Sequence, residues 1–251
     1  RERQEAIKEL AALPEWRQTL QAYALAKKIQ VSTRERLQQW FNEKNQFLDA
    51  GSWKLISILV PLAIITIVVL NILGIVSTAT MNYCLVASGS LALHIARKVT
   101  PLHQQVSRMT DEMEVFADSI RLIEQTTFKT EALRALQQKL IYPHGSASGS
   151  LRSIKRILER LDMRLNIVLF IPLAVLFQWD LQQIIALERW KHKHKADVLA
   201  WFETLGRFEA LSTLATLHFN HPQWVFPSFT EKAFFIEGKE MILEEGDSIW
   251  F

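Results

Sequence analysis

The sequence predicts an all-α fold: long lever-type helices, a two-helix transmembrane hairpin and a short irregular or β tail. Three observations lead to this prediction. The 251 residues include only 8 Gly and 7 Pro, and so few turn-forming residues favour long helices over many short strands. Residues 55–96 contain no Asp, Glu, Lys or Arg. Two later segments repeat apolar residues at alternating intervals of three and four, as helices that pack along one another do.

Composition narrows the class of protein. Cys84 is the single cysteine, so the chain has no internal disulfide framework and no cysteine cluster for a metal. The 29 basic residues exceed the 26 acidic ones by three, which is too small an imbalance to indicate a nucleic-acid partner by itself. Because the sequence begins with Arg1 and not Met, we treat it as a fragment or a processed chain.

The uncharged stretch divides into two candidate spans. Residues 55–73 are densely apolar, and about twenty such residues cross the hydrocarbon core of a bilayer as a helix. Residues 75–96 are more polar, but their small side chains suit close packing against the first helix. Gly74, with Ser77 and Thr78, supplies the turn. The alternative is a buried hairpin of a soluble protein.

Basic residues flank the two outer ends of this hairpin. Lys54 precedes it, Arg97 and Lys98 follow it, and the turn carries no charge. The positive-inside rule therefore places both termini in the cytoplasm, and we expect a bacterial inner membrane. A second apolar run, residues 165–179, is only about fifteen residues long, so we expect a buried core helix there.

The segments on either side of the hairpin contain residues that are typical of helix starts and ends. Residues 2–50 read as three helices, with Pro14 between the first two and a capping box at Ser32 and Glu35 opening the third. After the hairpin, Thr100 and Pro101 form an N-cap and first-residue pair. The first apolar seam that follows consists of Leu102, Val106, Met109, Met113, Phe116, Ile120 and Ile123.

A shorter helix is expected over residues 129–141, and residues 143–150 (PHGSASGS) form the clearest loop. Helical pattern then continues to about residue 219, followed by an irregular turn at 221–227 and strand-like pieces from Ala233. The second apolar seam consists of Leu151, Ile154, Leu158, Leu161 and Leu165.

One basic run is the candidate binding site. Arg189, Lys191, Lys193 and Lys195 lie within seven residues (RWKHKHK) and are suited to phosphates of DNA or of anionic lipid headgroups. A solvated helix face is the alternative reading. His192 and His194 are two residues apart, so on a helix they diverge by about 200° and cannot share a metal.

Other basic and aromatic features have simpler interpretations. The row Arg152, Arg156, Arg160 and Arg164 follows one helix face, but acidic residues interrupt it, so we expect a mixed, solvent-exposed face. Residues 41–43 (FNE) resemble the Phe-x-Glu reader of mismatch-recognition proteins, yet we interpret Phe41 as a packing residue. No catalytic, cofactor or metal site is predicted, and without a phosphate-binding loop this chain is not expected to be an enzyme.

The last third of the chain carries the most specific landmarks. They occur in one order: residues 178–180 (QWD), 186–191 (ALERWK), 208–215 (FEALSTLA) and 220–227 (NHPQWVFP). This order resembles the core and lever region of the MutS family, and residues 3–18 are similar to the start of that core. The whole chain is most similar to a membrane-associated branch of MutS-related proteins.

The resemblance implies a partner set and a division of the chain. MutS relatives are dimeric ATPases of DNA mismatch repair, so it implies a homodimer, double-stranded DNA and membrane lipid as partners. ATP and Mg²⁺ are expected only in a family ATPase domain, which has no counterpart here. The implied parts are an N-terminal core region (1–52), the transmembrane hairpin (53–97), core and lever helices (98–227) and a truncated junction (228–251).

Two functions follow for the whole chain. The first is a membrane-anchored MutS-like core that couples DNA contact to the nucleotide state of a DNA-repair ATPase. The second is a membrane-tethered helical scaffold or interaction protein without DNA binding. The sequence departs from the family after residues 238–241 (GKEM), where it reads ILEEGDSIWF, and this departure leaves ATPase activity outside the chain.

Overall fold

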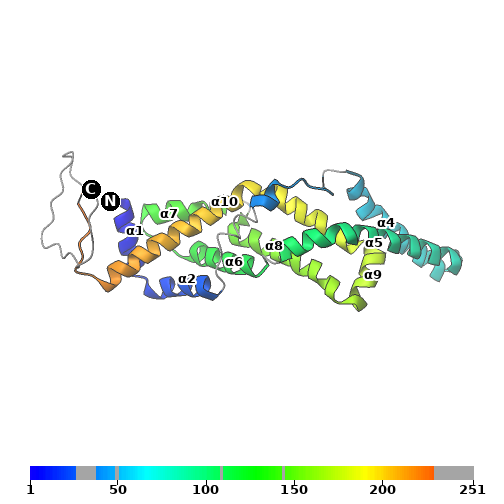
Figure 1. The fold of residues 1–251 in the computed structure, drawn as a ribbon, viewed down its shortest axis with the longest axis horizontal. Helices are drawn as coiled ribbons and strands as arrows, with labels where there is room; N and C mark the ends of the chain where they lie inside the picture. The colour runs from blue at the N-terminus through cyan, green and yellow to red at the C-terminus, as the bar shows by residue number, and fades with distance from the viewer. Residues whose placement is uncertain (27–37, 49–50, 108–109, 143–144, 229–251) are drawn as a thin grey trace.

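The computed structural model describes residues 1–26, 38–48, 51–107, 110–142 and 145–228. They form an elongated helical bundle (Figure 1). Within these ranges the only strands are the two-residue β1 (Ile141–Tyr142) and β2 (Gly145–Ser146), which pair antiparallel. The prediction of an all-α fold with minor β structure is therefore confirmed.

The longest helix, α10 (Trp179–Asn220), runs through most of the bundle. Its 42 residues extend about 63 Å at 1.5 Å per residue. Four other helices contact it along the shared rod, and α7 packs against α1. The rod helices are α1 (Glu2–Ala11), α2 (Pro14–Ala26), α6 (Thr110–Gln125), α7 (Glu131–Gln138) and α8 (Ala147–Asp162).

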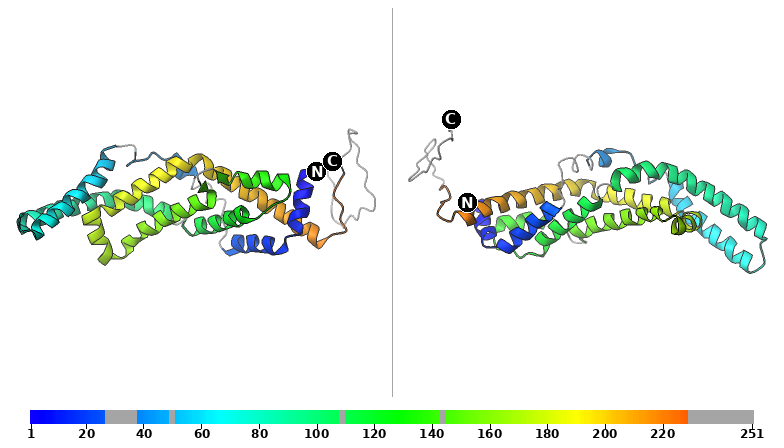
Figure 2. Two further views of the ribbon diagram at one scale, coloured as in Figure 1. Left: turned by 180° about the vertical axis from the view of Figure 1, so that it is seen from behind. Right: turned by 60° about the horizontal axis from the view of Figure 1, so that its bottom comes forward.

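The remaining helices gather at one end of the rod. The hairpin of α4 (Gly51–Ile72) and α5 (Thr78–Ser107) projects from this end, beside the short α9 (Ile167–Phe177). A 3₁₀ turn, η1 (Met163–Leu165), joins α8 to α9. The N-terminus and residues 221–228 lie at the opposite end, as the views of Figures 1 and 2 agree.

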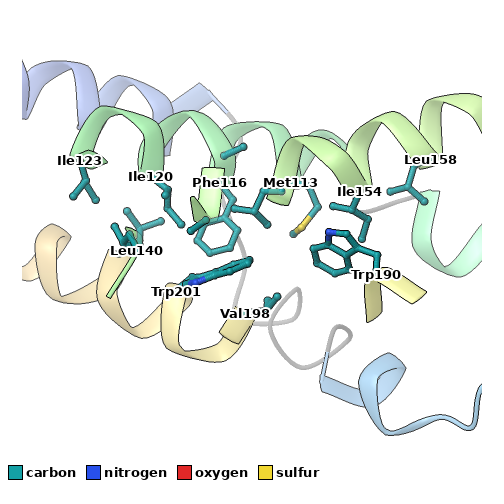
Figure 3. Close-up of a cluster of buried hydrophobic side chains, with 14 of the residues drawn as sticks. Met113, Phe116, Ile120, Ile123, Leu140, Ile154, Leu158, Trp190, Val198 and Trp201 are labelled. Atoms are coloured by element: carbon teal, nitrogen blue, oxygen red, sulfur yellow. The ribbon is translucent and has the colours of Figure 1, made fainter. Parts of the chain in front are cut away.

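The two predicted seams meet in the core of the rod. Figure 3 shows α6 and α8 facing α10, with Trp190, Val198 and Trp201 of α10 between them. Phe116 stacks on Phe202 with 4.1 Å between ring centroids. The buried seam residues are Met113, Phe116, Ile120 and Ile123 on α6 and Leu151, Ile154, Leu158 and Leu161 on α8. These residues confirm the two seams as core-forming faces, while the side chains of Val106 and Leu165 lie outside the described part of the structure.

Two predicted boundaries were wrong. Thr100 and Pro101 do not open a helix, because α5 continues through them to Ser107. The Thr100 hydroxyl donates to the Ala96 carbonyl at 2.6 Å, and packing of the hairpin against the rod outweighs the backbone hydrogen bond that a proline removes. The first seam is consequently shared between α5 and α6.

The predicted loop at 143–150 is shorter than expected, because α8 begins inside it at Ala147. Ser146 accepts a hydrogen bond from the Gly149 amide at 3.2 Å. The carboxylate of Glu124, on α6, accepts from the Ser148 amide at 3.1 Å. Two caps from outside the helix allow small, flexible residues to form its first turn. The capping box at Ser32 and Glu35, Met109 and the strands from Ala233 lie outside the described residues.

A carboxylate also caps α7 from a distant helix. Glu9, on α1, accepts hydrogen bonds from the backbone amides of Lys129 at 2.5 Å and Thr130 at 2.7 Å. Burial acts to raise the pKa of Glu9, but these hydrogen bonds outweigh it, so the pKa lies below its ordinary value. The negative charge at a helix N-terminus thus ties α1 to α7 at the distal end of the rod.

Glu9→Gln is expected to destabilise the protein by about 1 kcal/mol at neutral pH, because it weakens this charged cap. Since the folded-state pKa is lowered, the stabilisation is present above the ordinary pKa and is lost as pH falls through the lowered value. Urea unfolding of the detergent-solubilised protein at several pH values measures the difference. Glu5→Gln, on the exposed face of the same helix, is the control, and an equal effect of the two substitutions would contradict the cap.

Candidate membrane anchor and basic surface

The helix α4 presents apolar side chains to the outside along its whole length. Among the described helices, it alone is long and apolar enough to cross a membrane as a single continuous helix. A helix buried in a soluble core would not leave Ile58 66% and Leu62 61% exposed. The exposed large apolar residues of α4 are Leu55, Ile58, Leu59, Leu62, Ile65, Val69 and Ile72. This exposed surface is the candidate membrane anchor.

The turn of the hairpin is built as predicted around Gly74. Its φ of +75° lies in the left-handed region that glycine tolerates best. Asn71 donates through Nδ2 to the Val76 carbonyl at 2.9 Å, and Ser77 Oγ accepts from the Thr80 amide at 3.2 Å to cap α5. These local bonds satisfy polar groups that would otherwise be unpaired at the tip of an apolar hairpin.

At the other end of the hairpin, aromatic and basic side chains pair. Lys98 Nζ lies 5.6 Å from the centroid of the Trp53 ring, and Trp53 packs edge-on against Phe47 at 5.5 Å. Tryptophan and lysine are the residues that membrane proteins place at the boundary between hydrocarbon and water. Trp53 and Lys98 thus lie together at the end of the hairpin where α4 begins.

The prediction for the second apolar run was wrong. The helix α9 is not a buried core helix, because Val168 is 80% exposed and Ile171 is 57% exposed. It contacts α4 and α5 on one side and leaves its remaining apolar face without a covering element among the described residues. Length alone could not distinguish a helix inside the core from one that lies on its surface.

The junction of α9 and α10 is a sharp bend at Gln178. The two helices meet at 77°, and Gln178 has the left-handed backbone, with φ 50° and ψ 47°. Its side chain donates through Nε2 to the Ser88 hydroxyl at 2.9 Å and the Ser88 carbonyl at 3.2 Å. Ser88 in turn donates to the Val175 carbonyl at 2.5 Å. We call this set of Ser88, Val175 and Gln178 the joint.

The four basic residues of the run on α10 differ in their exposure to solvent. Arg189 and Lys193 are exposed four residues apart on one face, and Lys195 is exposed on another. Lys191 is only 4% exposed. Its ammonium donates to the Glu43 carbonyl at 2.7 Å and lies 5.3 Å from the centroid of the Trp40 ring. The structure therefore removes Lys191 from the candidate phosphate contacts.

Glu188, which sequence reasoning missed, lies beside Lys191 on the same buried face. It is 3% exposed, and its carboxylate accepts backbone hydrogen bonds from Gln46 at 2.8 Å, Phe47 at 3.0 Å and Leu48 at 2.6 Å. These three residues lead into α4. The sequence does contain a signal for this buried pair. Glu188 and Lys191 are three residues apart and occupy positions of α10 where the helical pattern would place apolar residues.

The segment before α4 is also held by its aromatic residues. Phe41 is 3% exposed and its ring lies 6.4 Å from that of Trp190. Trp40, next to it, is 1% exposed. The interpretation of Phe41 as a packing residue is confirmed, since its ring is inside the rod.

The two histidines of the run separate as predicted. His192 is exposed, whereas His194 is 4% exposed between the rings of Trp190 and Trp201. Burial lowers the pKa of His194, and the nearby Lys193 lowers it further, against the opposing effect of Asp197. Within the described residues no group of three or more His, Cys, Asp or Glu side chains is arranged to hold a metal ion.

Two basic residues of α8, Arg152 of the predicted row and the neighbouring Lys155, pair with acids of α6. Arg152 lies 3.0 Å from Asp118, and Lys155 lies 2.6 Å from Glu114 and 3.5 Å from Glu159. The contact with Glu159 lies within α8, whereas the other two join α8 to α6, and each such exposed pair contributes little energy. The predicted face is therefore mixed: Arg156 and Arg160 are exposed, and Arg152 contacts α6.

No protein-family model matches the chain, and no curated protein or solved structure is similar to it. The likeness to the MutS family therefore rests only on the order of landmarks in the sequence.

Replacing Glu188 with Ala is expected to destabilise the protein by roughly 3 kcal/mol, because three backbone amides lose a charged acceptor in a buried setting. Glu188→Gln, which keeps one carbonyl acceptor, should cost less. Urea unfolding followed by tryptophan fluorescence measures both. Glu203→Ala is the control, since the exposed Glu203–Arg207 pair should contribute less than about 1 kcal/mol. Equal losses at positions 188 and 203 would contradict the assignment.

Replacing Gln178 separates backbone strain from hydrogen bonding at the joint. Gln178→Ala loses both side-chain hydrogen bonds and keeps a Cβ in the left-handed region, whereas Gln178→Gly loses the same bonds without the Cβ. The alanine variant is therefore expected to be less stable than the glycine variant by about 1 kcal/mol. The same unfolding measurement decides, and a more stable alanine variant would contradict the left-handed bend.

Proposed function

We propose that this chain is a membrane-anchored lever, similar to the core of a MutS-like DNA-repair ATPase, that links a bilayer anchor to the region around residues 221–228. One observation supports this function above the others. The single helix α10 extends from the joint beside the hairpin to the end of the rod where the N-terminus lies (Figure 1). A displacement at one end of a continuous, packed helix is carried to the other end.

The packing around α10 supports a rod that moves as one body. Its core is one cluster of buried residues that continues from α1 to the last turns of α10. Trp16, for example, donates to Thr126 at 2.8 Å and packs edge-on against Phe128 at 5.7 Å. Such close packing makes internal rearrangement costly, so a displacement is expected to move the rod as a whole together with the anchor that the joint holds.

The proposed anchor uses both helices of the hairpin. In this proposal α4 and the apolar part of α5 cross a bacterial inner membrane, and both termini stay in the cytoplasm. The small residues of α5 support the second span, because they permit close packing in lipid. A homodimer is expected from the resemblance, and ATP and Mg²⁺ would belong to a partner domain outside this chain.

Labelling of single cysteines tests the anchor. In a Cys84→Ser background, Ile75→Cys lies at the turn of the hairpin and Gly206→Cys lies on the exposed face of the rod, where an added Cβ meets nothing within 4 Å. In inverted inner-membrane vesicles, a membrane-impermeant maleimide should label position 206 at once and position 75 only after the vesicles are opened. Immediate labelling at both positions would contradict a spanning hairpin.

DNA contact is the second part of the proposal. The exposed Arg189, Lys193 and Lys195 supply three cations near the middle of α10, a number that suits weak phosphate binding. In the alternative, a scaffold without DNA binding, these side chains are only a solvated surface. The geometry therefore favours the lever more strongly than it favours DNA contact.

Salt titration of DNA binding distinguishes a lever that contacts DNA from a scaffold that does not. Replacing Arg189, Lys193 and Lys195 together by Gln should lower the slope of log K against log salt by up to about 3 units, about 0.9 for each lost phosphate contact. The matched control replaces Lys129, Arg134 and Lys139, which are exposed on or beside α7. An equal effect of both triple variants, or no binding at low salt, would support the scaffold.

A further inference from the structure

We propose that α9 is itself a membrane element, which lies along the bilayer interface at the base of the hairpin. The helices α4, α5 and α9 then form one membrane-contacting end of the molecule, which we call the foot. This inference rests on the proposed anchor and extends it, because α9 is too short to be counted as a span. At 1.5 Å per residue its 11 residues extend about 16 Å, roughly half the thickness of the hydrocarbon core.

The composition of α9 fits lipid and does not fit water. Residues 165–179 contain no charged side chain, and Val168, Leu169 and Ile171 are each more than half exposed. A soluble protein rarely leaves so dense an apolar surface uncovered. The exposed face is a candidate contact surface, and its neighbours indicate what covers it.

Those neighbours are the helices of the anchor. One side of α9 packs on α4 and α5, where a Cβ placed at Gly89 would lie 3.6 Å from Val175. The exposed face of α9 therefore adjoins the exposed apolar surface of α4. Because the two surfaces adjoin, a bilayer that surrounds α4 also reaches α9.

The orientation of α9 indicates how it meets the bilayer. It runs across the long axis of the molecule in Figure 1 and is seen nearly end-on in the right view of Figure 2, whereas α4 and α5 extend away from the rod. If the hairpin enters the membrane, α9 lies along its surface. A helix that lies in this plane buries its outward-facing apolar side chains at the boundary between headgroups and acyl chains, and the other side of α9 is covered by α4 and α5.

Polar groups border α9 at both ends. At its start, Arg164 donates to Thr100 at 2.8 Å, lies 3.6 Å from the Asp180 carboxylate and sits 5.8 Å from the Phe170 ring. At its end, the indole of Trp179 donates to the Arg160 carbonyl at 2.9 Å. A paired arginine and a half-buried tryptophan are suited to the interface and would be costly deep in hydrocarbon.

Depth-dependent quenching in vesicles tests this position. In the Cys84→Ser background, a nitrobenzoxadiazole fluorophore is attached at Val168→Cys on α9, Ile65→Cys on α4 or Leu214→Cys on the distal part of α10, all on exposed side chains. The full chain is reconstituted into phosphatidylcholine and phosphatidylglycerol vesicles that carry a nitroxide at acyl carbon 5 or carbon 12. Circular dichroism confirms that each variant is folded.

The foot predicts a distinct result at each position. Position 168 should be quenched at least twofold more by the shallow nitroxide than by the deep one, position 65 more by the deep one, and position 214 by neither. Quenching at 65 without quenching at 168 would overturn the role of α9 and leave the anchor intact. Absence of quenching at 65 would overturn the anchor itself. A fluorophore at 168 shielded from aqueous iodide but untouched by either nitroxide would show that protein covers α9 and would also overturn the inference.

Discussion

The rod and its apolar foot meet at the backbone bend of Gln178. A left-handed conformation at a residue other than glycine costs about 1 kcal/mol, and here the side chain of the strained residue offsets that cost by donating twice to Ser88. The same bonds fix where α9 ends and where α10 begins. They also join the rod to α5, so the Gln178–Ser88 pair is one of the contacts that set the direction of the hairpin relative to the rod.

A second connection joins α10 to the segment that precedes α4. Glu188 and Lys191, buried on α10, hold the backbone of residues 43–48, the segment that leads into α4. Each helix of the hairpin is thus connected to α10 separately, α5 through Ser88 and α4 through this segment. Buried charges make such connections specific in position, because a displacement would take the ion away from its hydrogen-bond partners. A lever needs two such connections to transmit rotation as well as translation.

The features that sequence could predict are those that depend on local periodicity. The apolar spacing of Phe116, Ile120 and Ile154 specifies which face of α6 or α8 is buried, and the structure buries that face. Gly74 likewise marks its turn, because few other residues adopt its backbone. The features that sequence missed depend on distant partners: α5 continues through Pro101 because the rod packs along it, and Lys191 is buried because Trp40 and the Glu43 carbonyl meet it. The exposure of α9 belongs to the same class, since its composition suits a protein core and a lipid surface equally.

The central claim is that anchor and rod form one rigid lever in a membrane. The most direct measurement is the distance distribution between spin labels at Ile75→Cys, on the hairpin turn, and Gly206→Cys, on the rod, by pulsed electron resonance of the full chain in lipid vesicles. Labelled chain diluted with unlabelled chain excludes distances between copies. The account predicts a single narrow distribution that stays unchanged between detergent and bilayer. A broad or two-component distribution in the bilayer would show that the joint at Gln178 does not hold the hairpin, and would contradict the lever.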